Sequence, residues 1–345
     1  MDRLSSQWVS SWPTERCTLS TDETPEVITT YLGRESPAVR RLAGRTIPCA
    51  SARARQAGGR VCDEYGFELG RAVLPGTDHT VCHDACGSEL FDLTREASLR
   101  HELQPRHIFT TLIPVALLMA PGRPPSIVPD ASIDVALPRV ETTRGQRRGH
   151  ALALRRLLFD VKTIHGGTAH YYTAHAAEER AGAVRHRERQ VAQDYLSHAR
   201  QLDREHHGAA GTAAGPPGPI EQRLMSFTTP RGLVFGQYGE ASADVHDLIR
   251  IAADAIAEKQ WRLAGARTKS EMRGFLISRS RRRVGLRAVQ AMARHRLARV
   301  PYVGVPYAAL ADRAQRRADA FAAHDAPDPT HADFFQFQQG HVQRD

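Results

Sequence analysis

Apolar residues recur at helical spacing in three segments of the chain. From Ser242 onward, Val245, Leu248, Ile249 and Ala252 fall on one face, which predicts an amphipathic helix. The segment 88–103, SELFDLTREASLRHEL, predicts a second helix with Ser88 as its cap. A long helix is predicted from about Ala174 to His206, with its other faces crowded by Arg, Glu and His.

Shorter apolar runs, rich in β-branched residues, predict strands. They cover 108–119, 126–137, 153–164 and 232–238. A polar stretch that contains glycine joins the second and third runs and predicts a hairpin loop. The order helix, three strands, helix, strand, helix predicts an α/β fold, with helices packed against a mixed central sheet.

The same patterns suggest five regions. Residues 1–60 lack sustained periodicity and are expected to be poorly ordered. We assign the remainder as a short Cys/His segment (61–87), a main domain (88–260), a basic helical extension (261–310) and a tail (311–345).

Charge narrows the class of partner. The 345 residues carry a net charge of +9, and only three of the 47 basic residues are lysines, namely Lys162, Lys259 and Lys269. Arginine can donate two hydrogen bonds to one phosphate group at the same time, so a polyanion is the expected partner. A GC-rich coding sequence would also favour arginine, so part of this excess is compositional.

Neither membrane insertion nor secretion is expected. No stretch approaches the roughly 20 apolar residues of a membrane span. The beginning, Met1–Ser5, lacks the apolar segment of a secretory signal. Five cysteines without regular spacing do not suggest a disulfide framework, so an intracellular, reducing setting is expected.

Two predicted strands carry a candidate catalytic group. Pro129 and Asp130 lie in one, and Asp160, Val161 and Lys162 end an apolar run in the other. Side chains alternate along a strand, so Asp160 and Lys162 would share a face, while Val161 could offer its carbonyl. Two carboxylates and an ammonium at one point would bind a divalent metal and promote the attack of water on a phosphodiester.

Alternatives to this assignment remain open. Asp134 lies four residues after Asp130, on the same alternating face, and could be the ligand instead. An ordinary ion pair at a solvated strand end would also produce an Asp-x-Lys triplet.

These residues, with a helix before and a helix-strand-helix after, resemble the PD-(D/E)XK nuclease superfamily, the restriction-endonuclease-like fold. The resemblance spans roughly residues 88 to 260 as an arrangement of elements, and only the motif residues match by identity. It implies that Asp130 and Asp160 are metal ligands for Mg²⁺ or Mn²⁺ and that Lys162 is catalytic. The family often adds an acidic residue from the preceding helix, for which Glu96 and Glu102 are candidates.

A second group of residues resembles a degenerate zinc knuckle, of the kind found ahead of such nuclease domains in retrotransposon proteins. It comprises Cys62, His79, Cys82, His83 and Cys86, of which four could hold a structural Zn²⁺. No Cys-x-x-Cys pair opens the motif, so free thiols and surface histidines are the competing interpretation.

The densest basic cluster is the candidate nucleic-acid contact. It consists of Arg279, Arg281, Arg282 and Arg283. The same cluster would suit a nuclear address if the source is eukaryotic.

The sequence therefore predicts a metal-dependent endonuclease acting on DNA, associated with a mobile element. The alternative is a nucleic-acid-binding protein whose nuclease fold no longer cuts.

Overall fold

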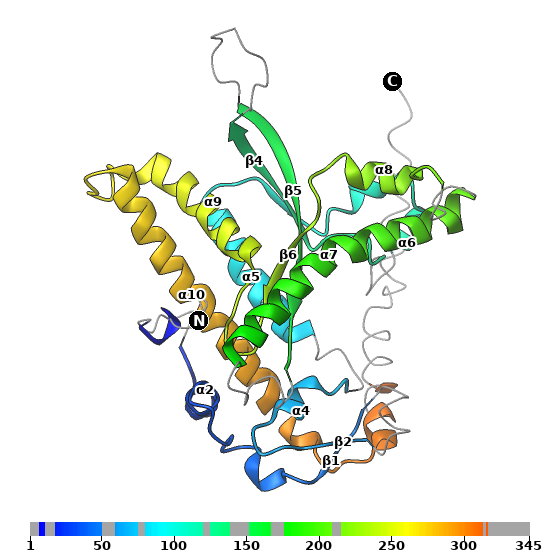
Figure 1. The fold of residues 1–345 in the computed structure, drawn as a ribbon, viewed down its shortest axis with the longest axis vertical. Coiled ribbons are helices and arrows are strands. Elements are labelled where there is room, and N and C mark those ends of the chain that lie inside the picture. The colour runs from blue at the N-terminus through cyan, green and yellow to red at the C-terminus, as the bar shows by residue number, and fades with distance from the viewer. Residues whose placement is uncertain are drawn as a thin grey trace, which may run out of the picture.

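The computed structural model describes residues 7–10, 18–49, 59–74, 80–119, 125–138, 152–166, 176–208, 215–312 and 315–316. These residues form a mixed α/β structure, with a four-stranded sheet between helices and a separate two-stranded sheet (Figure 1). The expected hairpin loop at 141–150, His79 and most of the expected tail lie outside the described residues.

The four-stranded sheet has the order β3–β4–β5–β6. Its strands are β3 (His101–Leu103), β4 (Ala131–Pro138), β5 (Leu152–Thr163) and β6 (Arg231–Phe235). The first three are antiparallel neighbours, and β6 runs parallel to β5. Because β4 begins at Ala131, opposite Phe159, residues 160–163 of β5 pair only with β6. The two central strands therefore diverge where the candidate catalytic residues lie.

Helices α5 (Thr80–Glu96) and α9 (Ala243–Gln260) cover one face of this sheet, and α10 (Lys269–Leu297) packs on both of these helices (Figure 1). Their apolar faces meet alternate residues of β5, namely Leu157, Phe159 and Val161, in the largest hydrophobic cluster. Each of these three side chains is at most 1% exposed. Burial of one large apolar side chain stabilises a fold by roughly 1.5–3 kcal/mol, so this cluster is a main source of stability.

The opposite face of the sheet is covered by α7 (Ala176–His207) and α8 (Pro219–Met225), with η3 (Arg106–Phe109) and α6 (Val115–Leu118) beside them (Figure 1). Leu158 of β5 points into this second cluster. The alternation of Leu157, Leu158 and Phe159 between the two layers is the two-residue period expected of a strand buried on both faces.

Helix α7 approaches β6 closely at Gly232. A Cβ atom at this position would lie 3.1 Å from both Glu188 Cα and Val191 Cγ2. The glycine thus allows the backbones of α7 and β6 to come together. Gly232 is also the register partner of Asp160, so this crossing brings α7 next to the candidate site.

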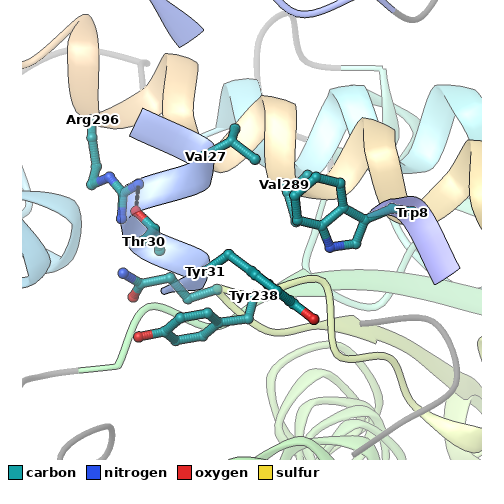
Figure 2. Close-up of a pocket in the computed structure, with 8 residues that line it drawn as sticks. Trp8, Val27, Thr30, Tyr31, Tyr238, Val289 and Arg296 are labelled. Carbon is teal, nitrogen blue, oxygen red and sulfur yellow. Dashed lines mark hydrogen bonds between the residues drawn. The ribbon is translucent and has the colours of Figure 1, made fainter. Parts of the chain in front are cut away.

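The N-terminal elements η1 (Trp8–Ser10) and α2 (Glu23–Tyr31) pack on α10. Trp8 and Tyr31 meet edge to face, with ring centroids 5.4 Å apart. Figure 2 shows the small pocket between these elements, α10 and the turn after β6, which has room for about one water molecule. Arg296 closes one side of it and donates to Thr30 Oγ1.

A third group of short elements surrounds the end of α10. It contains η2 (Arg40–Leu42), β1 (Thr46–Ile47), β2 (Arg60–Val61), α4 (Phe67–Arg71) and η5 (Val300–Tyr302). Strands β1 and β2 form the two-stranded antiparallel sheet. Val39, Ile47, Leu69 and Val303 share a buried cluster here, so residues from both ends of the chain complete one core.

Most predicted elements are confirmed, but the strand expected at 108–119 is wrong. That segment contains η3 and α6, with Ile108, Phe109 and Ile113 buried and Val115 exposed, which is not a two-residue period. The first strand of the sheet is instead β3. The preceding helix starts at Thr80 rather than Ser88 and ends at Glu96.

Three of the predicted region boundaries are also corrected. Residues 18–49, expected to be poorly ordered, contain α2 and β1 and bury Val27 and Ile47. Segment 61–87 is not one unit, because β2 and α4 join the third group while α5 joins the main core. The expected extension at 261–310 contains α10, whose apolar face completes the main core.

Candidate active site

The structure brings Asp130 to the Asp160–Lys162 segment. Asp130 immediately precedes β4, and its Oδ2 accepts a hydrogen bond of 2.7 Å from the backbone N–H of Val161. Asp160 Oδ2 lies 2.6 Å from Lys162 Nζ. Two carboxylates that are far apart in sequence and one ammonium are therefore held where β4 and β5 diverge.

Strand alternation sets the directions of these side chains. Val161 is fully buried in the main core, on the α5 side of the sheet. Asp160 points to the α7 side and is 5% exposed, while the side chain of Lys162 is 33% exposed. The predicted division of the triplet between two faces is confirmed. Lys162 and Asp130, whose side chain is 24% exposed, are the members of the group that reach solvent.

His83 of α5 supports Asp130 from the other layer. Its Nε2 lies 3.0 Å from Asp130 Oδ2, and its Nδ1 lies 2.8 Å from Asp84 Oδ1. Burial lowers the pKa of His83, but the hydrogen bonds and charges of Asp130 and Asp84 outweigh it and raise the pKa to about 9. The imidazolium thus partly neutralises Asp130.

Tyr195 of α7 contacts the other carboxylate. Its hydroxyl donates to Asp160 Oδ1 at 3.2 Å, and the ring is only 4% exposed. Burial and the charges of Asp160 and Asp130 raise the pKa of this phenol well above its ordinary value, so the phenol keeps its proton.

The two aspartates have opposite electrostatic environments. Burial raises the pKa of Asp160, and the neighbouring charge of Asp130 adds to this, while Lys162 opposes it. For Asp130, burial is outweighed by His83 and by the Val161 N–H, which lower its pKa. Ionisation of Asp160 is therefore less favourable than that of Asp130, and a cation bound beside Asp160 would stabilise its ionised form.

Asp134 does not face Asp160. It is the register partner of Arg156, and its two carboxylate oxygens accept from Arg156 Nε and Nη2 at 2.8 and 3.3 Å. Arg100 lies 3.7 Å from the same carboxylate. Of the two aspartates considered from sequence, Asp130 is the one that joins the group.

Neither acidic candidate from the preceding segment reaches the site. Glu96 is the last residue of α5 and pairs with Arg283 Nη1 at 2.6 Å. It lies 13 residues beyond His83, or about 20 Å along a helix. Glu102 lies on β3 and pairs with His107 Nδ1 at 2.8 Å. The position nearest Asp130 on α5 is occupied by the imidazole of His83.

The cysteines expected to bind zinc are divided between two hydrophobic clusters. Cys82 and Cys86 lie in the main core, at most 1% exposed, while Cys62 lies in the cluster around α4. Cys82 Sγ donates to Ala291 O. Burial raises the pKa of Cys62 to about 11 and that of Cys86 well above its ordinary value, so both remain thiols. These three residues do not form a zinc site; His79 lies outside the described range.

The four arginines at 279–283 are not a uniform solvent-exposed patch. Arg279 is exposed, whereas Arg281, Arg282 and Arg283 are half-buried. Arg283 pairs with Glu89 and Glu96 of α5 and so holds two core helices together. The guanidinium of Arg283 is therefore engaged by these two carboxylates within the fold.

Sequence reasoning missed the roles of His83 and Tyr195. In the sequence His83 lies among the cysteines, and Tyr195 lies at helical spacing with the apolar residues of the long helix. One feature of the sequence does point to Tyr195, because it shares an apolar stripe with Val184, Val191 and Ala199. A tyrosine there brings a hydroxyl into an apolar layer, and a buried hydroxyl needs a hydrogen-bond partner. Its partner could not be read from the stripe itself.

The carboxylate pair suits a hard divalent cation. Mg²⁺ is commonly bound through one or two carboxylates and keeps several waters, and Asp130 and Asp160 supply that number of carboxylates. Across the described residues, no group of three or more His, Cys, Asp or Glu side chains is gathered for a metal. Water would therefore provide much of the coordination shell.

Comparison with known proteins adds no assignment. None of the described helices is both long and apolar enough to cross a bilayer. No protein-family model, no curated protein and no solved structure gives a significant match to this chain.

Proposed function

We propose that this chain is a metal-dependent endonuclease that hydrolyses DNA phosphodiester bonds. The carrying observation is the convergence of Asp130, Asp160 and Lys162 where β4 and β5 diverge. The order α5, β3, β4, β5, α7, β6 also supports a restriction-endonuclease-like fold, because it is the order implied by the resemblance to PD-(D/E)XK nucleases.

Each residue has a distinct role in this proposal. Asp130 and Asp160 would hold Mg²⁺ or Mn²⁺, which would supply Lewis-acid stabilisation of the phosphate and of the attacking water. The Val161 N–H and His83 fix the carboxylate of Asp130. Lys162, partly exposed beside Asp160, would neutralise the developing charge on the phosphate or orient the water.

Cleavage of supercoiled plasmid with Mg²⁺ or Mn²⁺ tests this function. Asp160→Asn and Lys162→Ala should each lower the cleavage rate at least about 100-fold, because each removes a charge that the transition state requires. Matched controls are Asp134→Asn, a carboxylate on the neighbouring strand paired with Arg156, and Lys259→Ala. Both should cleave like wild type at a temperature where all variants are folded. Equal activity of Asp160→Asn and wild type would refute the assignment.

A second function is a nucleic-acid-binding protein that no longer cuts. Two observations favour it: Lys162 already neutralises Asp160, and no third acidic side chain from α5 joins the pair in the described structure. In that case the wild-type protein would bind DNA with an affinity that falls as salt rises, and no divalent metal would induce cleavage.

A further inference from the structure

We propose that Tyr195 is a positioning residue, which fixes the carboxylate of Asp160 for cation binding. This inference rests on the proposed nuclease function and concerns the same site. It follows from the hydrogen bond between the Tyr195 hydroxyl and Asp160 Oδ1 and from the way α7 is held against the sheet.

Three groups together determine the orientation of Asp160. Tyr195 donates to Oδ1 at 3.2 Å, and Lys162 lies 2.6 Å from Oδ2. Asp160 is only 5% exposed, so protein groups must replace the hydrogen bonds that water would donate to its carboxylate. Asp130 adds a neighbouring negative charge. With the Tyr195 hydroxyl on one oxygen and the Lys162 ammonium beside the other, the carboxylate cannot rotate freely away from Asp130.

Tyr195 is placed by the packing of α7. Gly232 lets Val191 approach β6 closely, and Tyr195 lies one helical turn further along. Asp160 is the register partner of Gly232. The phenol therefore reaches Asp160 from a rigid helix in the buried layer, rather than from a loop.

Apolar packing explains the ring of Tyr195 but not its hydroxyl. The ring belongs to the cluster with Leu158, Val191 and Ala199, which phenylalanine would fill equally well. The other acceptor near the hydroxyl, Val128 O, is farther away at 3.5 Å.

The inference predicts a defined phenotype for Tyr195→Phe. Removal of a group that orients a metal ligand typically costs 10- to 100-fold in metal affinity or activity. We expect Mn²⁺ affinity, measured by calorimetric titration, to fall about 10-fold or more. Plasmid cleavage should lose kcat, while KM for DNA stays unchanged because the hydroxyl is buried.

Tyr238→Phe is the matched control, because Tyr238 is a second buried tyrosine, 8% exposed, that contacts Arg180 rather than the aspartates. It should leave Mn²⁺ affinity unchanged. In an Asp160→Asn background, Tyr195→Phe should cause no further loss of Mn²⁺ affinity, because its effect acts through Asp160.

The outcomes separate this inference from the proposed function. If wild type binds Mn²⁺ and cleaves, and Tyr195→Phe matches it in both, the positioning role is overturned and the nuclease stands. If Tyr195→Phe only lowers the thermal stability, the hydroxyl is merely structural and the inference is likewise overturned. If wild type neither binds Mn²⁺ nor cleaves, both fall.

Discussion

At the scale of single residues, the buried carboxyl of Asp244, outside the candidate site, should make the stability of the fold depend on pH. Burial raises its pKa to about 6, Arg231 opposes this, and Glu188 adds to it. The folded state therefore holds a proton that the unfolded state has lost. The stabilisation is present below about pH 4 and disappears as pH rises through about 6.

Asp244→Asn should remove this pH dependence, since the amide oxygen can still accept the Gly232 N–H. Relative to wild type, the variant should gain about 1–2 kcal/mol in unfolding free energy between pH 4 and 7, after allowance for partial exposure. Urea unfolding across that range measures it. Asp254→Asn, an exposed position on the same helix, is the control. If the difference in unfolding free energy between Asp244→Asn and wild type did not change with pH, the raised pKa of Asp244 would be contradicted.

Residue patterns placed Asp160 and Lys162 on one face because strand alternation is a local rule. Asp160 and Lys162 are two residues apart, and their shared face follows from the strand itself. His83 and Tyr195 belong to helices on opposite sides of the sheet, and their reach depends on how α5 and α7 pack. No local period specifies that packing, so their contacts appear only in the folded chain.

At the scale of elements, Arg299, two residues beyond the end of α10, fastens this segment to α4, beside a longer contact of His295 Nε2 with Gly70 O at 3.3 Å. Arg299 is 1% exposed, and its Nη1 is shared among Leu69 O, Gly70 O and Ala72 O at 2.8–2.9 Å. These carbonyls lie at the C-terminal end of α4, where a cation is favoured by the helix dipole. The guanidinium satisfies acceptors that the short helix leaves unpaired.

Arg299→Met should therefore destabilise the fold by about 3 kcal/mol, because buried carbonyls lose a charged donor. Chemical denaturation monitored by circular dichroism measures the loss. Arg273→Met removes an exposed ion pair with Asp254 and should cost at most about 1 kcal/mol. Equal effects of the two substitutions would show that the buried contact contributes little.

Element prediction succeeded where a period was long enough to read. The helix at 176–207 and the strand at 152–163 match their predicted ranges closely, and the helix at 243–260 begins where it was predicted. Strand β3 has only three residues, too few to show alternation. The run at 108–119 contains apolar residues whose burial is fixed by α7 and α8 and not by a strand period.

At the scale of the whole molecule, the sequence suggested a boundary near residue 260 because arginines dominate the segment beyond it. The structure instead packs α10 against α5 and α9. Its buried residues include Met272, Leu276, Val284, Ala288 and Met292, spaced along one apolar stripe. The many charged residues of α10 lie on the side that meets solvent, and their number does not indicate how much the apolar side contributes to the core.

A chain that ends at residue 260 should consequently fail to fold cooperatively. Removing α10 would expose the α10-facing sides of α5 and α9, leave Glu89 without Arg283, and remove the surface on which α2 packs. A chain that ends at residue 312 retains all these contacts and is the control. We expect the longer chain to show near-ultraviolet circular dichroism and a single sharp thermal transition, and the shorter chain to show neither. A cooperative transition in the shorter chain would mean that residues 88–260 form an independent domain after all, with α10 as an appendage.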